Sequence, residues 1–171
     1  MTNPEFIPAA KPIIGDEERK AVDAVLASGM IAQGPKVEEF ETKFGEKALG
    51  GSAAIAVNSG TSALHLGLLA AGIGPGDEVI VPSFTFAATG NSVAAVGATP
   101  VFADVDEYFC LDAEDVRSRI TDRTKGIMPV HLYGHPANLT ALQEVADEAG
   151  IAIFEDCAQA HLASWGGKPV G

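Results

Sequence analysis

Two adjacent carboxylates, Glu155 and Asp156, follow the short apolar run of residues 151–154 near the end of the chain. Such a run is typical of a buried strand, and a charge at the end of a buried strand is costly unless a cation or a hydrogen-bond donor meets it. Because successive side chains of a strand point in opposite directions, we expect the two acids to have different partners. A simpler interpretation, in which a strand-end acid caps a turn, also fits the pattern.

Residues 58–64, with the sequence NSGTSAL, form a second candidate site. Gly60 permits a tight turn between a strand and a helix, and Thr61 and Ser62 open the helix. Free backbone N–H groups, two hydroxyls and the positive end of a helix dipole would then converge on one spot, which suits a phosphate. Ordinary helix capping by Ser or Thr is the alternative interpretation. No GKS or GKT tripeptide follows, so the segment is not a Walker A loop.

Phe86 and His131 also follow predicted strands. An aromatic residue at the position of Phe86 either packs in the core or stacks on a planar ligand. His131 and His135 are four residues apart, but Gly134 and Pro136 accompany them. The pair is therefore not expected to share a helix face as zinc ligands do, and we predict no metal site.

The elements that must position these residues alternate between short apolar strands and longer helices from residue 53 onward. Strands are predicted at residues 53–57, 78–82, 99–105, 125–130 and 151–155. Helices are predicted at residues 16–28, 34–49, 61–72, 85–97, 112–120 and 138–150. Strand–helix alternation predicts an α/β fold with a mostly parallel sheet and helices on both of its faces. In such sheets ligands bind beyond the carboxyl ends of the strands, where the candidate residues fall.

The composition narrows the class of protein. The 171 residues are 47% hydrophobic, which suffices for a core in a single domain. Eleven basic against 23 acidic residues give a formal net charge of −12, which argues against nucleic acid and anionic membranes as partners. Two cysteines are too few for a disulfide framework. The first residues do not have the pattern of a signal peptide. No apolar run reaches the ~20 residues that are needed to span a membrane. These features predict a soluble cytoplasmic protein.

The donors of residues 58–64 form what we call the phosphate cup. The phosphate cup, an aromatic ring such as that of Phe86 and an acid after a later strand follow one another along the chain, and a single ligand could use all three. Pyridoxal 5'-phosphate has a phosphate, a flat ring and a basic ring nitrogen. A carboxylate keeps that nitrogen protonated, and the protonated ring takes up the electrons of a carbanion at the substrate carbon. Asp156 is the better candidate for this role, because a charge-assisted hydrogen bond would offset its desolvation. Glu155 should then point away, toward a helix or a backbone donor.

The same segments resemble the DegT/StrS family of pyridoxal-phosphate-dependent sugar aminotransferases, which have the aspartate aminotransferase fold (fold type I). The resemblance spans nearly the whole chain. It is carried, in order, by SGMIAQGPKVEEFE, VNSGTSALHLGL, GPGDEVIVPSFTFAAT, GATPVFADVD, PVHLYGHPA and EDCAQAH. It implies that residues 1–171 are the N-terminal part of the cofactor-binding large domain, and that the rest of this domain and a small domain follow Gly171.

The resemblance also implies a set of cofactor-binding residues, all just after a strand or at the start of a helix: Gly60, Thr61, Ser62, Phe86, His131, Asp156 and Gln159. The first three would form the phosphate cup, and Phe86 would stack on the ring. Asp156 would bind the pyridine nitrogen, and Gln159 would contact the ring or its phenolic oxygen. His131 would lie near the ring.

The resemblance further implies the substrates and partners. A loop with Met30, Ile31 and Gln33 would approach the sugar. The amino acceptor would be a nucleotide-linked keto-sugar, and glutamate would donate the amino group and become 2-oxoglutarate. Two subunits would form a homodimer with active sites between them.

In the family, the lysine that forms the Schiff base lies beyond the position of Gly171, so we predict no catalytic residue within the chain and expect it to be inactive alone. Lys168 is bracketed by Gly and Pro in a predicted surface turn, and a solvated lysine is a poor Schiff-base nucleophile. Leu162 stands where the family commonly has glycine. Two alternatives stay open: a dehydratase of the same family in which another residue replaces the lysine, and a non-catalytic truncated or regulatory protein.

Overall fold

The computed structural model describes residues 11–171. The chain divides after Glu39 into two compact units. Residues 1–10, on which the prediction of no signal peptide rests, lie outside the described residues. Within the described part of the chain no helix is long and apolar enough to cross a membrane. The cytoplasmic location stays a prediction.

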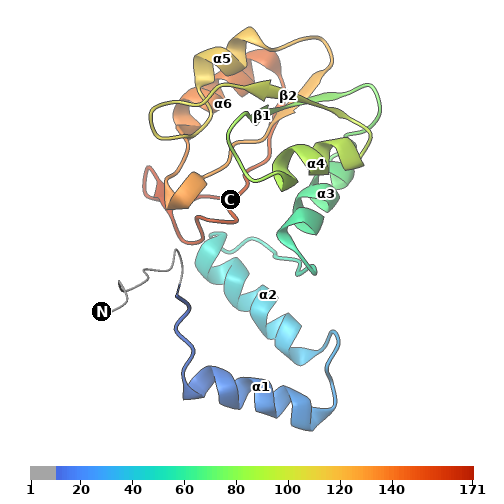
Figure 1. The fold of residues 1–171 in the computed structure, drawn as a ribbon, viewed down its shortest axis with the longest axis vertical. Helices are drawn as coiled ribbons and strands as arrows, with labels where there is room; N and C mark the ends of the chain where they lie inside the picture. The colour runs from blue at the N-terminus through green and yellow to red at the C-terminus, as the bar shows by residue number, and fades with distance from the viewer. Residues whose placement is uncertain (1–10) are drawn as a thin grey trace, which may run out of the picture. The chain divides into compact units, whose positions relative to one another are not determined.

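The first unit contains helix α1 (Asp16–Ser28) and the beginning of helix α2 (Pro35–Ala48), which runs across the boundary. Both helices were predicted, and Figure 1 shows them in blue and cyan. Gly29 ends α1 in the left-handed conformation, with a φ of 73° that favours glycine. The apolar side chains of Val22 and Leu26 on α1 are 59% and 62% exposed. Helix α1 therefore buries no residue of its own.

The second unit is built on a four-stranded parallel sheet. Its strands are β1 (Glu78–Pro82), β2 (Thr99–Ala103), β3 (Thr124–Ile127) and β4 (Ala152–Ile153), in the spatial order β2-β1-β3-β4. Helix α3 (Gly60–Ala70) precedes β1, and successive strands are connected by α4 (Ala88–Ala95), α5 (Ala113–Ser118) and α6 (Leu139–Ala149). The predicted parallel sheet is confirmed.

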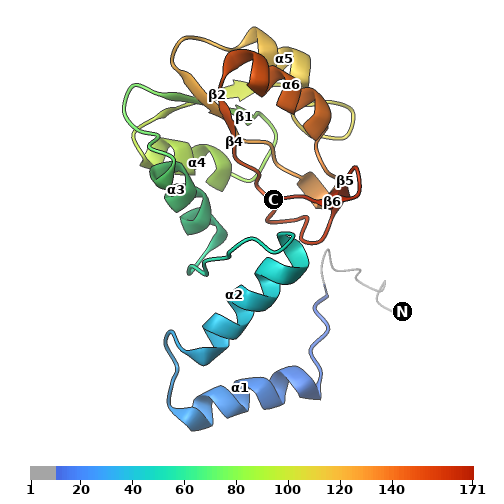
Figure 2. The same ribbon diagram turned by 180° about the vertical axis from the view of Figure 1, so that it is seen from behind.

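Helices cover both faces of this sheet. Ile80 of β1 belongs to a buried cluster with residues of α5 and α6. Its neighbours Val79 and Val81 point the other way, into a cluster with residues of α3 and α4. Figures 1 and 2 show the two pairs of helices on opposite sides of β1 and β2. Burial of each of these side chains stabilises the folded state by roughly 1.5–3 kcal/mol relative to an exposed side chain. The two clusters therefore hold the sheet between its helices.

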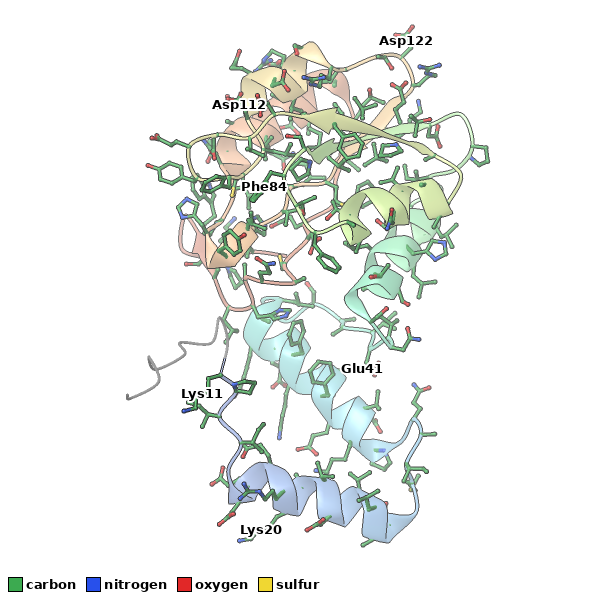
Figure 3. All side chains as sticks on the ribbon, in the orientation of Figure 1. Lys11, Lys20, Glu41, Phe84, Asp112 and Asp122 are labelled. Atoms are coloured by element: carbon green, nitrogen blue, oxygen red, sulfur yellow. The ribbon has the colours of Figure 1, made fainter. Side chains whose placement is uncertain are left out.

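The predicted strand at residues 53–57 is wrong. The segment has no regular secondary structure, and no described strand pairs with it. Ile55 is 85% exposed, and the backbone N–H of Ala56 donates to the Glu41 carboxylate at 2.7 Å instead of to a neighbouring strand. Figure 3 labels Glu41 on α2. Apolar residues of strand type do not make a strand without a partner edge, because the ladder hydrogen bonds come from the neighbour.

Other predicted elements are shorter in the structure. The helix predicted at 85–97 begins only at Ala88, which leaves Phe86 in a loop after β1. The chain ends in a short antiparallel hairpin of β5 (Ser164–Trp165) and β6 (Lys168–Pro169), which Figure 2 labels. Gly166 and Gly167 make its two-residue turn with φ values of 56° and 80°, which suit glycine. Lys168 is exposed beside this turn, as predicted.

Candidate functional site

A cavity of about 230 Å³ lies at the carboxyl ends of the parallel strands. It is formed by the first turn of α3, the loop between β1 and α4, and the segments after β3 and β4. Five of the predicted cofactor-binding residues line it together: Gly60, Thr61, Phe86, Asp156 and Gln159. These residues are up to 99 positions apart in the sequence (159 − 60), and the sheet topology brings them to one place.

Asp156 is the acidic residue of this cavity, and it is buried, with 7% of its surface exposed. Its Oδ2 accepts a hydrogen bond from Thr89 Oγ1 at 3.3 Å, and its Oδ1 accepts one from the Ala158 N–H at 3.1 Å. Its backbone N–H donates to Pro129, and its carbonyl accepts from His131, which extends the pairing of β3 with β4. Within residues 11–171 no Lys, Arg or His pairs with the Asp156 carboxylate. A buried carboxylate on a cavity wall with only neutral donors fits a cationic ligand.

The beginning of α3 provides the second part of the site. Ser59 caps this helix, because its Oγ accepts a hydrogen bond from the Ser62 N–H at 3.1 Å. No described residue accepts from the backbone N–H groups of Gly60 and Thr61 or from the Thr61 hydroxyl. These donors lie at the positive end of the helix dipole and line the cavity, an arrangement that suits an anion.

Ser62 belongs to the helix cap. Its hydroxyl donates to Asn58 Oδ1 at 2.7 Å and lies 2.9 Å from the Ser59 hydroxyl. Ser62 is not among the residues that line the cavity. The helix-capping interpretation therefore describes Ser62, while Gly60 and Thr61 keep donors for a ligand.

Phe86 and Gln159 form the remaining walls. The Phe86 ring is 73% exposed, so it packs in no core and presents an apolar face at the cavity. The side-chain oxygen of Gln159 accepts a hydrogen bond from the Tyr133 N–H at 2.8 Å. Tyr133 has a φ of 54°, which is uncommon for a residue other than glycine. Because this bond uses the amide oxygen, the NH₂ group of Gln159 is left as a donor toward a ligand.

His131 does not line this cavity, and its ring is fully buried beside it. Its Nδ1 accepts a hydrogen bond from the Ala137 N–H at 2.9 Å, so the neutral ring has its proton on Nε2. Nε2 lies 2.9 Å from Glu155 Oε2, to which it donates. Glu155 also accepts from the Gly171 N–H at 2.9 Å. The predicted backbone donor for Glu155 is thus present, and the His131 contact was missed, although an acid and a histidine at the ends of adjacent strands are a signal for it.

The hydrogen bond from His131 lowers the pKa of Glu155, burial raises it and the Gly171 N–H lowers it further, with a net decrease. Burial, with the negative charges of Glu155 and Asp156, raises the pKa of the Cys157 thiol to about 12. Ligand atoms of His131, Glu155 and Cys157 lie within 4.8 Å of one another. A metal there would have to displace the Nε2 proton and the thiol proton, so the contacts favour a hydrogen-bonded pair over a metal site.

The predicted substrate loop lies in the first unit, between α1 and α2. Met30 and Ile31 are 53% and 73% exposed, and Gln33 is exposed as well. Met30 lines a small apolar hollow of about 220 Å³ with neighbours that include Val25 and Pro35. These contacts lie within the first unit, so the role of the loop toward a sugar stays a prediction.

A larger hollow, of about 780 Å³, opens at the opposite end of the sheet, where Asp77 and Lys125 lie at the amino ends of β1 and β3. None of the predicted site residues lines it. Parallel sheets bind their ligands at the carboxyl ends of the strands, so the smaller cavity at Asp156 is the candidate site.

The carboxyl edge of the parallel sheet thus has a free helix N-terminus, an exposed aromatic ring and a buried acid around one cavity, the arrangement expected of a fold type I pyridoxal-phosphate enzyme. Comparison with known proteins agrees. The chain belongs to the DegT/DnrJ/EryC1/StrS aminotransferase family, whose model matches residues 12–171. The predicted family and fold class are confirmed.

Three solved structures illustrate the similarity. DesV of S. venezuelae, in complex with a ketimine intermediate, is 46% identical with a TM-score of 0.77 over 85% of this chain. 3-Amino-5-hydroxybenzoic acid (AHBA) synthase is 41% identical with a TM-score of 0.90 over 98% of this chain. The putative sugar aminotransferase Spr1654 of Streptococcus pneumoniae, in its PMP form, is 34% identical with a TM-score of 0.89 over 97% of this chain. The chain spans 40%, 44% and 45% of these three proteins, respectively.

Proposed function

We propose that the chain is the N-terminal part of the cofactor-binding large domain of a pyridoxal-phosphate-dependent aminotransferase. The observation that carries this proposal is the cavity in which Asp156 faces the free N-terminus of α3 beside Phe86. Family membership and the PMP form of the similar Spr1654 structure support it. The rest of the large domain, the small domain and the Schiff-base lysine would come from beyond Gly171.

Each residue of the cavity would have one task toward the cofactor. Gly60 and Thr61 would bind the phosphate through their free donors, and Asp156 would hold a proton on the pyridine nitrogen. Phe86 would cover one face of the ring and keep water from it. The Gln159 amide would donate to an oxygen of the ring. The cofactor itself supplies the electron sink for chemistry at the substrate carbon.

The substrate proposal is a nucleotide-linked keto-sugar as amino acceptor, glutamate as amino donor with 2-oxoglutarate as its product, and a homodimer as the working assembly. The sugar is supported by the name of the similar Spr1654, a putative sugar aminotransferase. A similar protein of known structure is named as 3-amino-5-hydroxybenzoic acid synthase, so the substrate class needs its own test.

Titration of the chain with pyridoxamine 5'-phosphate tests the cofactor proposal. We expect saturable binding that needs the phosphate, so pyridoxamine alone should bind at least about tenfold more weakly. Asp156→Asn should weaken binding by a similar factor, while Asp77→Asn, which alters an acid outside the cavity, should leave it unchanged. Binding that is indifferent to both the phosphate and Asp156 would overturn the proposal.

Borohydride reduction after addition of pyridoxal 5'-phosphate tests the place of the lysine. We expect no stoichiometric label on any lysine of the chain, because Lys168 is an exposed hairpin residue.

A second experiment tests the substrate class. The protein extended past Gly171 should convert its amine-form cofactor to the aldehyde form when a nucleotide-linked keto-sugar is added, and not when the unlinked nucleotide is added.

A further inference from the structure

We infer that Thr89 is a positioning residue that orients the Asp156 carboxylate toward the cavity. The inference rests on the proposed function, because it concerns the group that would meet the cofactor ring. Thr89 lies in the first turn of α4 and is fully buried, yet it does not line the cavity. Its part in the site is therefore indirect, through Asp156.

The contacts of Thr89 fix the direction of its hydroxyl. Thr89 Oγ1 lies 3.3 Å from Asp156 Oδ2 and 3.1 Å from Thr85 Oγ1. A carboxylate only accepts, so the single Thr89 proton is donated to Asp156, and Thr85 must donate to Thr89. The three side chains form one directed chain of hydrogen bonds from the cavity wall, where Thr85 lies, to the acid.

This chain determines how Asp156 is held. Oδ2 has Thr89 as its side-chain donor, and Oδ1 has the Ala158 N–H. With one neutral donor on each oxygen, the carboxylate cannot rotate without losing a bond in a buried place, which is costly. Its remaining lone pairs are left for a cation in the cavity. The turn that carries Thr89 also carries Phe86, whose carbonyl accepts from the Thr89 N–H at 3.1 Å.

The structure offers a matched control on the same helix. Ser92 is also buried, at 1% exposure, and its hydroxyl donates to the Thr89 backbone carbonyl at 2.8 Å. Ser92→Ala removes a buried hydroxyl one turn away without touching Asp156. Thr89→Val removes the Thr89 hydroxyl and keeps the shape of the side chain, whereas Thr89→Ser keeps the hydroxyl.

The first measurement is a double-mutant cycle on the chain without any cofactor. Thr89→Val, Asp156→Ala and the double variant are unfolded with urea. We expect Thr89→Val to lower the folding equilibrium constant about tenfold more when Asp156 is present than when it is replaced by Ala. Ser92→Ala should show no such coupling. Equal cost of Thr89→Val in both backgrounds would overturn the inference, and Thr89→Ala takes its place in the cycle if the valine variant does not fold.

The second measurement reports the orientation of the acid itself. Pyridoxamine 5'-phosphate labelled with ¹⁵N in the ring is bound to each variant, and the ¹⁵N shift gives the fraction of protonated ring nitrogen as pH rises. We expect about a tenfold shift of this equilibrium toward the neutral ring in Thr89→Val, with recovery in Thr89→Ser and no change in Ser92→Ala. An unchanged signal in Thr89→Val would overturn the inference. If wild-type protein binds no labelled compound, the proposed function fails, and the cycle still decides the role of Thr89.

Discussion

Nε2 of His131 lies 2.9 Å from Oε2 of Glu155, so a partly buried side-chain hydrogen bond joins the segments that follow β3 and β4. The next residue, Asp156, makes its side-chain contacts with Thr89 and Ala158 instead. Two neighbouring acids therefore have separate functions, as the alternation of strand side chains requires. Glu155 joins structural elements, and Asp156 faces the candidate site.

The first prediction concerns the acid stability of the chain. The His131 hydrogen bond lowers the pKa of Glu155 from its ordinary value of 4.5. A lowered pKa in the folded state gives a stabilisation that is present above pH 4.5 and is lost as the pH falls through the folded value. Glu155→Gln should therefore reduce the free energy of unfolding most at neutral pH, and the difference from wild type should shrink below pH 4.5.

Urea unfolding of both proteins across this pH range measures the effect. Glu114→Gln serves as a control, because this acid is exposed and its carboxylate lies beside Arg117 instead of His131. A difference between Glu155→Gln and wild type that stays constant down to acid pH would contradict the prediction.

The sequence predicts most strands and helices of the sheet because the spacing of apolar residues and the residue composition favour strand or helix within a short segment. Val79, Ile80 and Val81 are consecutive apolar residues, as expected of a strand with a helix layer on each face, and the structure shows both layers. The segment around Ile55 has similar apolar residues but no neighbouring strand. Pairing is a long-range property, so a local pattern cannot supply it.

The site was predictable where a residue acts through its place after a strand or at a helix start. Gly60, Thr61 and Asp156 reach the cavity for that reason. Ser62 also lies at a helix start, but its hydroxyl contacts Asn58 and Ser59 of the same segment instead of the cavity. The contact of His131 with Glu155 joins two segments that are 24 residues apart, so it depends on the pairing of neighbouring strands. A hydroxyl can cap its own helix as well as bind a ligand, and only the three-dimensional partners separate the two.

The second prediction concerns the two ends of the Gln159 amide. Its oxygen accepts from the Tyr133 N–H, and its NH₂ group is the donor left for a ligand. Gln159→Glu keeps an acceptor for Tyr133 but removes the donor, so pyridoxamine 5'-phosphate should bind about tenfold more weakly while the Tyr133 amide stays protected from hydrogen exchange. Gln159→Leu should lose both binding and protection. Loss of protection in Gln159→Glu would contradict the assignment of the amide.

The third prediction concerns the reactivity of Cys157. Burial and the nearby carboxylates raise the pKa of this thiol to about 12, so little thiolate exists at mildly alkaline pH. The native chain should react slowly with iodoacetamide, and urea should expose Cys157 and the buried Cys110 together. Glu155→Gln removes one of the negative charges that raise the pKa, and should therefore speed alkylation of Cys157 in the folded chain. Native reactivity equal to that of the unfolded chain would contradict the burial of this thiol.

The fourth prediction compares two glycines that differ in what a side chain would meet. A Cβ at Gly126 of β3 would lie 2.5 Å from the Phe154 ring and 3.3 Å from the Ala152 carbonyl oxygen, so both the ring and the sheet backbone would have to shift. Gly126→Ala should lower the free energy of unfolding by about 1–3 kcal/mol. A Cβ at Gly67 in α3 would meet nothing within 4 Å, so Gly67→Ala should raise it by about 0.5–1 kcal/mol through the better helix propensity of alanine. Urea unfolding of both variants measures these opposite signs, and a neutral Gly126→Ala would show that the Phe154 ring has room to move.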